Sequence, residues 1–211
     1  MKSTLDSNVF IYGSVSNKCS ELLMDVYDRS ISNMILRSVR EETYEKLIYL
    51  SSMINHFLDE LRKSEPDKLI ESDYYKSLRF TFPQIYDALK EYVKNHERED
   101  IKDQLFRTHK DINYIIKILS RENLIYPVEE DYDYPEDIEI KLKKFISNDK
   151  DCRHLTLCHK YITENLRLKE KLKFITLDKK DFQKGGKKKN IEKLIKNLIV
   201  EILDFNYEVK L

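Results

Sequence analysis

The sequence has few glycines and prolines: its 211 residues include three glycines and four prolines. A chain with so few residues that favour special turns is expected to be compact and mostly helical. An excess of charge of either sign is also missing, because 38 basic residues balance 38 acidic ones. Overall charge therefore predicts no class of partner, and any attraction for nucleic acid must come from how the charge is distributed.

Cysteine is scarce as well. Cys19, Cys152 and Cys158 form no even set, which favours reduced thiols in an intracellular protein. Cys152 and Cys158, with the histidines near them, do not match the spacing of a zinc site. No apolar run is long enough to span a membrane, and the first residues lead into a strand rather than a signal peptide. We therefore expect a soluble cytoplasmic protein with no membrane partner.

The first 64 residues show the order strand, helix, strand, helix. Residues 3–13 combine a strand, an acid and an apolar entry to a helix, and residues 18–29 have helical spacing. A short strand over 33–39 leads directly into a long amphipathic helix over 40–64. This alternation favours a parallel sheet.

The middle of the chain differs in character. Residues 66–121 show helical periodicity interrupted at Pro66 and Pro83, which predicts two or three helices and no strand. Residues 126–139 are acidic and contain two prolines, a composition typical of an exposed linker.

The C-terminal part returns to mixed structure. We predict, in order, a helix over 138–148, a helix over 148–168, a buried strand over 173–178, a basic loop over 179–189, an amphipathic helix over 190–203 and a last strand over 205–211. The expected organisation is a discontinuous domain made of 1–64 and 148–211, with an all-helical insertion at 65–147.

Acidic residues follow the expected strands or begin the helices after them. Asp6 and Asp178 end strands, whereas Glu41 or Glu42 and Asp151 begin helices. In an open parallel sheet these positions share one edge, where ligands bind. Converging carboxylates repel one another and need a cation, and hard oxygen ligands suit Mg²⁺ or Mn²⁺.

Each acid also has a structural alternative. Asp6 could cap the helix that follows it, and Asp178 could begin a turn through its side chain. Glu42 and Asp151 lie where a helix macrodipole favours an acid in any case.

Four segments resemble the motifs of PIN domains. They are "LDSNVFIYG" after the first strand, "SVREE" at the start of the long helix, "DCRHLTLCHKY" and "FITLDKKDF". Their order matches the family, and the resemblance covers about 1–50 and 148–210. It implies a three-layer α/β/α fold with a central, mostly parallel sheet, and a Mg²⁺- or Mn²⁺-dependent ribonuclease.

The resemblance also implies roles for individual residues. Asp6, Glu42, Asp151 and Asp178 correspond to the catalytic metal ligands, and Asp181 to an auxiliary ligand or a hydrogen-bonded neighbour of one.

Other positions remain open or supporting. Asn8 and Thr176 would orient Asp6 and a water molecule by hydrogen bonds. Glu41 or Glu45 could replace the second acid, and Asp149 could replace the third, because neighbours on a helix point about 100° apart.

His154 and four lysines lie near these acids in the sequence. We expect His154 to pack or cap rather than act as a base, since hydrolysis by metal-activated water needs no histidine. The lysines flank a glycine pair and could hold RNA phosphates, although a solvated loop is an equal alternative. They are Lys184, Lys187, Lys188 and Lys189.

The sequence therefore predicts an endoribonuclease that hydrolyses single-stranded RNA. Two alternatives remain: an RNA-binding or assembly module of the same fold without nuclease activity, and the toxin of a toxin–antitoxin pair. The insertion at 65–147 would select substrates, form a homodimer or dock on a protein partner. The RNA and the number of metal ions stay open.

Overall fold

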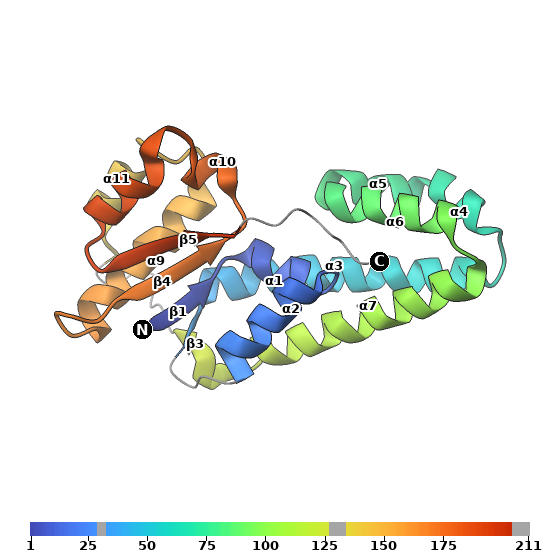
Figure 1. Ribbon diagram of the computed structural model, residues 1–211, viewed down its shortest axis with the longest axis horizontal. Coiled ribbons are helices and arrows are strands. Elements are labelled where there is room, and N and C mark those ends of the chain that lie inside the picture. Colours follow the sequence, from blue (N-terminus) through green and yellow to red (C-terminus); the bar gives the residue numbers. More distant parts are fainter. Residues whose placement is uncertain (29–32, 127–133, 204–211) are drawn as a thin grey trace. The chain divides into compact units, whose positions relative to one another are not determined.

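A computed structural model of the chain describes residues 1–28, 33–126 and 134–203 (Figure 1). Helices predominate, and a small parallel sheet is present. Contacts divide the chain into two units. The sheet unit contains Met1–Val9, Met24–Thr43 and Arg121–Phe205, and the helical unit contains Phe10–Leu23 and Tyr44–Ser120 within the described ranges. The bounds of these units differ from those of the expected domain, because the units are defined by contacts within the chain. The discontinuous domain expected for 1–64 and 148–211 stays a prediction.

The sheet unit is built on three parallel strands. They are β1 (Lys2–Leu5), β4 (Leu172–Thr176) and β5 (Leu198–Ile202), in the order β1-β4-β5. Leu5 lies opposite Ile175 on β4. The parallel arrangement confirms the α/β character expected from the sequence, because parallel strands need long crossover connections between them.

A second parallel pair lies beside β1. It consists of β2 (Ile35–Leu36) and β3 (Ile125–Tyr126). The backbone amide of Met34 donates to the carbonyl of Ser3 at 3.3 Å, which places β2 next to β1. Because β3 lies within 65–147, the prediction that this insertion is all helical was wrong.

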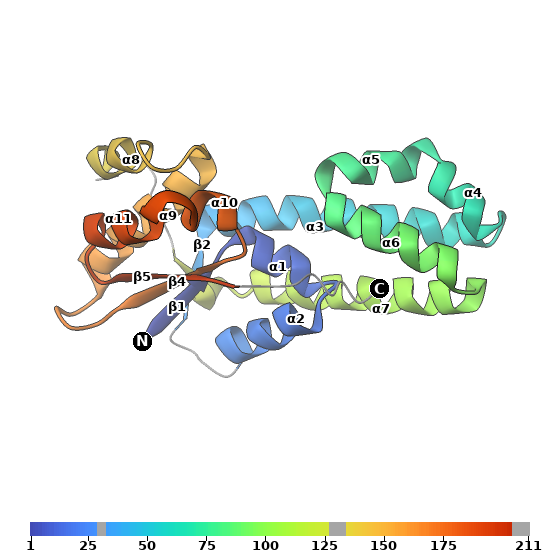
Figure 2. The same cartoon turned by 45° about the horizontal axis from the view of Figure 1, so that its top comes forward.

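Helices cover the strands of the sheet unit (Figure 2). The longest, α9 (Asp149–Asn165), contacts β2, β4 and β5, and α8 (Glu136–Leu142) packs beside it. The short α10 (Lys179–Phe182) and the eight-residue α11 (Lys187–Leu194) contact β5.

Two C-terminal predictions were wrong. The stretch 179–189 contains α10 and the start of α11 rather than a loop, and the helix predicted over 190–203 ends at Leu194. The reason is that Asn197 takes a left-handed φ of 67° and turns the chain into β5, whose β-branched residues pair with β4. Residues 127–133 of the predicted linker and the strand predicted at 205–211 lie outside the described residues.

Residues 66–121 form four α-helices where two or three were expected. They are α4 (Pro66–Glu71), α5 (Asp73–Thr81), α6 (Pro83–Asn95) and α7 (Arg98–Leu119). The long α3 (Arg37–Leu61) begins in the sheet unit and continues into the helical one from Tyr44. Pro66 and Pro83 are the first residues of α4 and α6. Proline is favoured at this position because it lacks a backbone N–H, and the first N–H of a helix has no partner within the helix.

The remaining helices lie near the N-terminus. α1 (Ser7–Gly13) leads to α2 (Asn17–Leu23) and a π-helical turn at Met24–Asp28. A Cβ on Gly13 would lie 2.3 Å from Leu23 Cδ1 and 3.2 Å from Ile115 Cδ1, so a glycine allows α1 to approach both side chains closely.

The core of the helical unit is apolar. Phe57, Leu69, Tyr75 and Leu89 line a small apolar cavity together with residues of α7. The buried hydroxyl of Tyr75 donates to the carbonyl of Tyr86 at 2.7 Å, which satisfies the one polar atom of that ring. None of the described helices combines the length and apolar character needed to cross a membrane.

Candidate metal site

Asp6 lies at the end of β1 and is 3% exposed. Its backbone amide donates to the carbonyl of Ile175 at 2.9 Å and so extends the pairing with β4. Its carboxylate accepts two short hydrogen bonds, from the Ser7 amide to Oδ1 and from the Thr176 hydroxyl to Oδ2, both at 2.7 Å. The carboxylate therefore accepts one hydrogen bond from the next residue in the chain and one from β4.

These partners keep Asp6 charged. Burial by itself would raise its pKa, but interaction with His154 and the hydrogen bonds from Thr176 and Ser7 outweigh burial, so the pKa lies below its ordinary value. Asp6 is therefore a carboxylate at neutral pH.

Asp151 is the least satisfied acid of the site. It lies in the first turn of α9, is 5% exposed, and its Oδ2 has no hydrogen-bond partner among the described residues. Burial raises its pKa to about 8, helped by the charges of Asp6, Asp178 and other nearby acids. Asp149, the alternative ligand, is exposed and pairs with Lys143 at 3.4 Å.

Asp178 and Asp181 approach Asp151 from the end of β4. Asp178 caps α10, because its Oδ1 accepts from the Asp181 amide at 3.0 Å. Asp181 is buried, accepts from Ser147 Oγ at 3.0 Å, and lies 3.4 Å from Lys187 Nζ. The side chain of Asp178, considered above as the start of a turn, thus caps a helix instead, and it also lies near the other acids.

Two overlapping groups of side chains could each hold a metal ion. In Asp6, Asp151 and His154, one potential ligand atom from each lies within 4.8 Å of the others, and the same holds for Asp151, Asp178 and Asp181. Asp151 belongs to both groups. Three converging ligand atoms are a large part of the shell that Mg²⁺ or Mn²⁺ needs, with water completing it.

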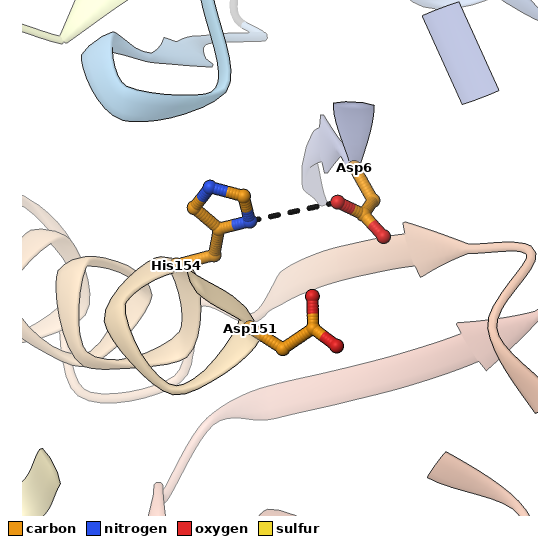
Figure 3. Close-up of side chains that lie close together, drawn as sticks. All are labelled: Asp6, Asp151 and His154. Atoms are coloured by element: carbon orange, nitrogen blue, oxygen red, sulfur yellow. Dashed lines mark ion pairs between the residues drawn. The ribbon is translucent and has the colours of Figure 1, made fainter. Parts of the chain in front are cut away.

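His154 lies among these acids (Figure 3). Its side chain is 3% exposed, Nδ1 is 3.5 Å from Asp6 Oδ1, and Nε2 is 3.9 Å from Glu42 Oε2. The ion-pair distance to Asp6 is too long for a hydrogen bond, and Nδ1 has no hydrogen-bond partner among the described residues. The sequence contained a signal for this position, since His154 follows Asp151 at the i, i+3 spacing that shares one helix face.

Glu42 lies beside the site but in neither group. Its Oε1 is 3.2 Å from Lys150 Nζ, and its other oxygen faces His154. Glu41 is exposed and pairs with Arg37 at 3.0 Å, and Glu45 is exposed too. Of these three acids, Glu42 is the one whose carboxylate contacts a residue of the candidate site.

Asn8 and Thr176 form a hydrogen-bond network behind Asp6. The Thr176 hydroxyl donates to Asp6 and accepts from the Asp178 amide at 3.0 Å. Asn8 Nδ2 lies 3.4 Å from the same hydroxyl, and its Oδ1 accepts from the Leu177 amide at 3.3 Å. One threonine therefore links the acids that follow β1 and β4.

The described lysines after Asp181 differ in whether they contact the acids of the site. Lys187 pairs with Asp181, whereas Lys188 lies 3.9 Å from Glu192 and Lys189 is exposed. The side chain of Lys184 lies outside the described part of the chain. Lys187 is therefore the lysine whose position ties it to the acids.

Comparisons of this chain with protein-family models, with curated proteins and with solved structures found no match. The resemblance to PIN domains consequently depends on the four sequence motifs. Any function must be argued from the geometry of the site itself.

Proposed function

We propose that this chain is a metal-dependent endoribonuclease of the PIN type, which hydrolyses phosphodiester bonds of single-stranded RNA. Asp6, Asp151 and Asp178 would bind one or two Mg²⁺ or Mn²⁺ ions, with Asp181 as an auxiliary acid. Asn8 and Thr176 would hold Asp6 in position.

One observation supports the proposal above the others: Asp151 Oδ2 is buried among acids and has no hydrogen-bond partner. A carboxylate in this environment is costly unless a cation neutralises it. Strong perturbation of a carboxyl pKa in such a cluster is typical of functional sites.

The residues present fit a divalent cation. Their potential ligand atoms are mostly carboxylate oxygens, which hard cations prefer. A bound divalent ion lowers the pKa of a water molecule and neutralises charge on a phosphodiester, which is the chemistry that hydrolysis of RNA requires. The lysines after Asp181 would add attraction for phosphates.

The test is cleavage of labelled single-stranded RNA by the full chain with Mn²⁺ or Mg²⁺. Asp6→Asn and Asp178→Asn are expected to abolish metal-dependent cleavage. Asp149→Asn is the matched control, because Asp149 is an exposed acid of the same helix as Asp151 and should leave cleavage unchanged. Full activity in Asp6→Asn or Asp178→Asn would show that the assignment is wrong.

A second function is RNA binding or assembly without catalysis. It is favoured by the basic side chains that lie next to the acids of the site. Lys187 lies beside Asp181, Lys150 beside Glu42, and His154, when protonated, beside Asp6. These cations offset part of the acidic charge without a metal. A protein that binds RNA but shows neither stabilisation by Mn²⁺ nor cleavage would favour this second function.

A further inference from the structure

We propose that His154 Nδ1 is itself a metal ligand, which makes the Asp6–Asp151–His154 group a mixed nitrogen and oxygen site that prefers Mn²⁺ to Mg²⁺. The inference depends on the metal-binding part of the proposed function. It assigns to His154 a place that the sequence motifs gave to a carboxylate.

The first argument is geometric. Asp6, Asp151 and His154 point toward one another from the end of β1 and the first turns of α9 (Figure 3). His154 Nδ1 and Asp151 Oδ2 are both buried and both lack a hydrogen-bond partner among the described residues. A buried polar atom without a partner is expensive. Because one ligand atom each of Asp6, Asp151 and His154 lies within 4.8 Å of the others, one cation among them would offset that cost.

The second argument concerns the other ring nitrogen. A histidine that binds a metal through one nitrogen usually donates its other N–H to a carboxylate, which fixes the tautomer and the ring orientation. Nε2 of His154 faces Glu42 Oε2 at 3.9 Å, so a small side-chain movement would form this hydrogen bond. Lys150 holds the other oxygen of Glu42 at 3.2 Å. Glu42 is therefore a positioning residue for His154 rather than a ligand.

The third argument is the chemical contrast between the two groups. Asp151, Asp178 and Asp181 offer only oxygen atoms, whereas His154 adds an imidazole nitrogen to Asp6 and Asp151. Mg²⁺ strongly prefers oxygen ligands, and imidazole suits transition metals better. We therefore expect Mn²⁺ to occupy the histidine-containing position even when Mg²⁺ is in excess.

The experiment is pulsed electron paramagnetic resonance of the full chain with bound Mn²⁺. We expect a nitrogen hyperfine coupling that changes when the protein is labelled with nitrogen-15 histidine, a measurement that needs no variant. His154→Gln should remove the coupling and weaken Mn²⁺ binding by at least about 10-fold, since even outer partners of a metal ligand are worth that much. His159→Gln, on the same helix, is the control and should keep both.

The outcomes separate this inference from the proposed function. Bound Mn²⁺ without a histidine nitrogen coupling would overturn the role of His154 and leave the acidic metal site standing. No binding of Mn²⁺ to the wild-type chain would overturn the metal site and the proposed nuclease together. Glu42→Gln should retain the coupling. If Glu42→Gln lost all Mn²⁺ binding while His154→Gln kept it, Glu42 would be the ligand and His154 the positioning residue.

Discussion

The described acidic residues of the helical unit are exposed or half-buried, and several pair with neighbours, as Glu65 does with Arg98 at 2.8 Å and Glu99 with Lys102 at 3.0 Å. In the sheet unit, by contrast, Asp151 is buried with Asp6 in one group of potential ligands and with Asp181 in another. The helical unit thus follows the usual rule that charge stays in water. The sheet unit departs from it at one edge, and such departures concentrate at functional sites.

This contrast separates two sources of stability. The helical unit depends on apolar packing, to which its exposed ion pairs add little. The sheet unit carries an electrostatic cost whose size depends on pH and on cations. Four predictions, ordered from the largest expected effect to the smallest with the pH effect taken per pH unit, test that difference.

The largest effect is expected from the apolar core of the helical unit. Phe57 is 3% exposed, and its ring centroid is 5.5 Å from that of Tyr75. Phe57→Ala should lower the free energy of unfolding by about 3–5 kcal/mol, because it removes buried apolar contacts and leaves a cavity. Urea denaturation measures this. Phe80→Ala is the control, since Phe80 is 88% exposed and its loss should change stability by less than about 0.5 kcal/mol.

Mn²⁺ should stabilise the chain through the acids of the sheet unit. At a free concentration a hundred times the dissociation constant, an ion that binds only the folded state adds about 2.7 kcal/mol. Thermal melts with and without Mn²⁺ should show this in the wild-type chain and much less of it in Asp6→Asn. An equal shift in both proteins would place the ion elsewhere.

The metal-free chain should lose stability as the pH rises from about 4 to about 8. Asp151 has a folded pKa of about 8 against an ordinary 3.8, so over this window the folded state holds a proton that the unfolded chain has released. One such group changes the unfolding free energy by at most about 1.4 kcal/mol per pH unit. Asp6 acts oppositely, because its lowered pKa contributes stability that is lost as the pH falls below its ordinary value.

Denaturation midpoints across this pH range measure the effect. Asp151→Asn should flatten the decline, whereas Asp149→Asn should leave it intact because that acid is exposed. A decline that persists unchanged in Asp151→Asn would assign it to another group.

The smallest effect is expected at the surface of the helical unit. Glu65→Gln breaks the ion pair with Arg98, in which the Glu65 side chain is 72% exposed and the Arg98 side chain 40%. The cost should stay below about 1 kcal/mol and should shrink as salt is added. A loss above that bound, measured by urea denaturation, would mean that the helical unit depends on charge after all.

Much of the local structure could be predicted from the sequence. The strand before Asp6, the strand before Asp178 and the long helix after β2 all appeared near their observed positions. The prediction over 190–203 failed because a short apolar run fits a helix and a buried strand equally well. Pairing of Leu198–Ile202 with β4 decided in favour of the strand.

The site was predictable only in part. Asp6, Asp151, Asp178 and Asp181 were identified as candidates from their places at strand ends and helix starts, and the structure brings them together. His154 was assigned to packing or capping, because the motif contains acids and the hydrolysis needs no histidine. The structure buries His154 on the face of α9 that also carries Asp151, beside Asp6, and its role as a metal ligand is a proposal.

The sequence by itself determined which residues are acidic, where most of the long helices lie and where the candidate acids stand relative to their own strands or helices, because residue identity and local periodicity decide these properties. Only the tertiary structure decided which acids meet. Asp149 and Asp151 are two residues apart, about 200° around a helix, so they lie on opposite faces of α9. Asp149 is exposed, whereas Asp151 is buried beside Asp6. That difference arises because β1 pairs with β4, from the other end of the chain, and α9 packs against that sheet.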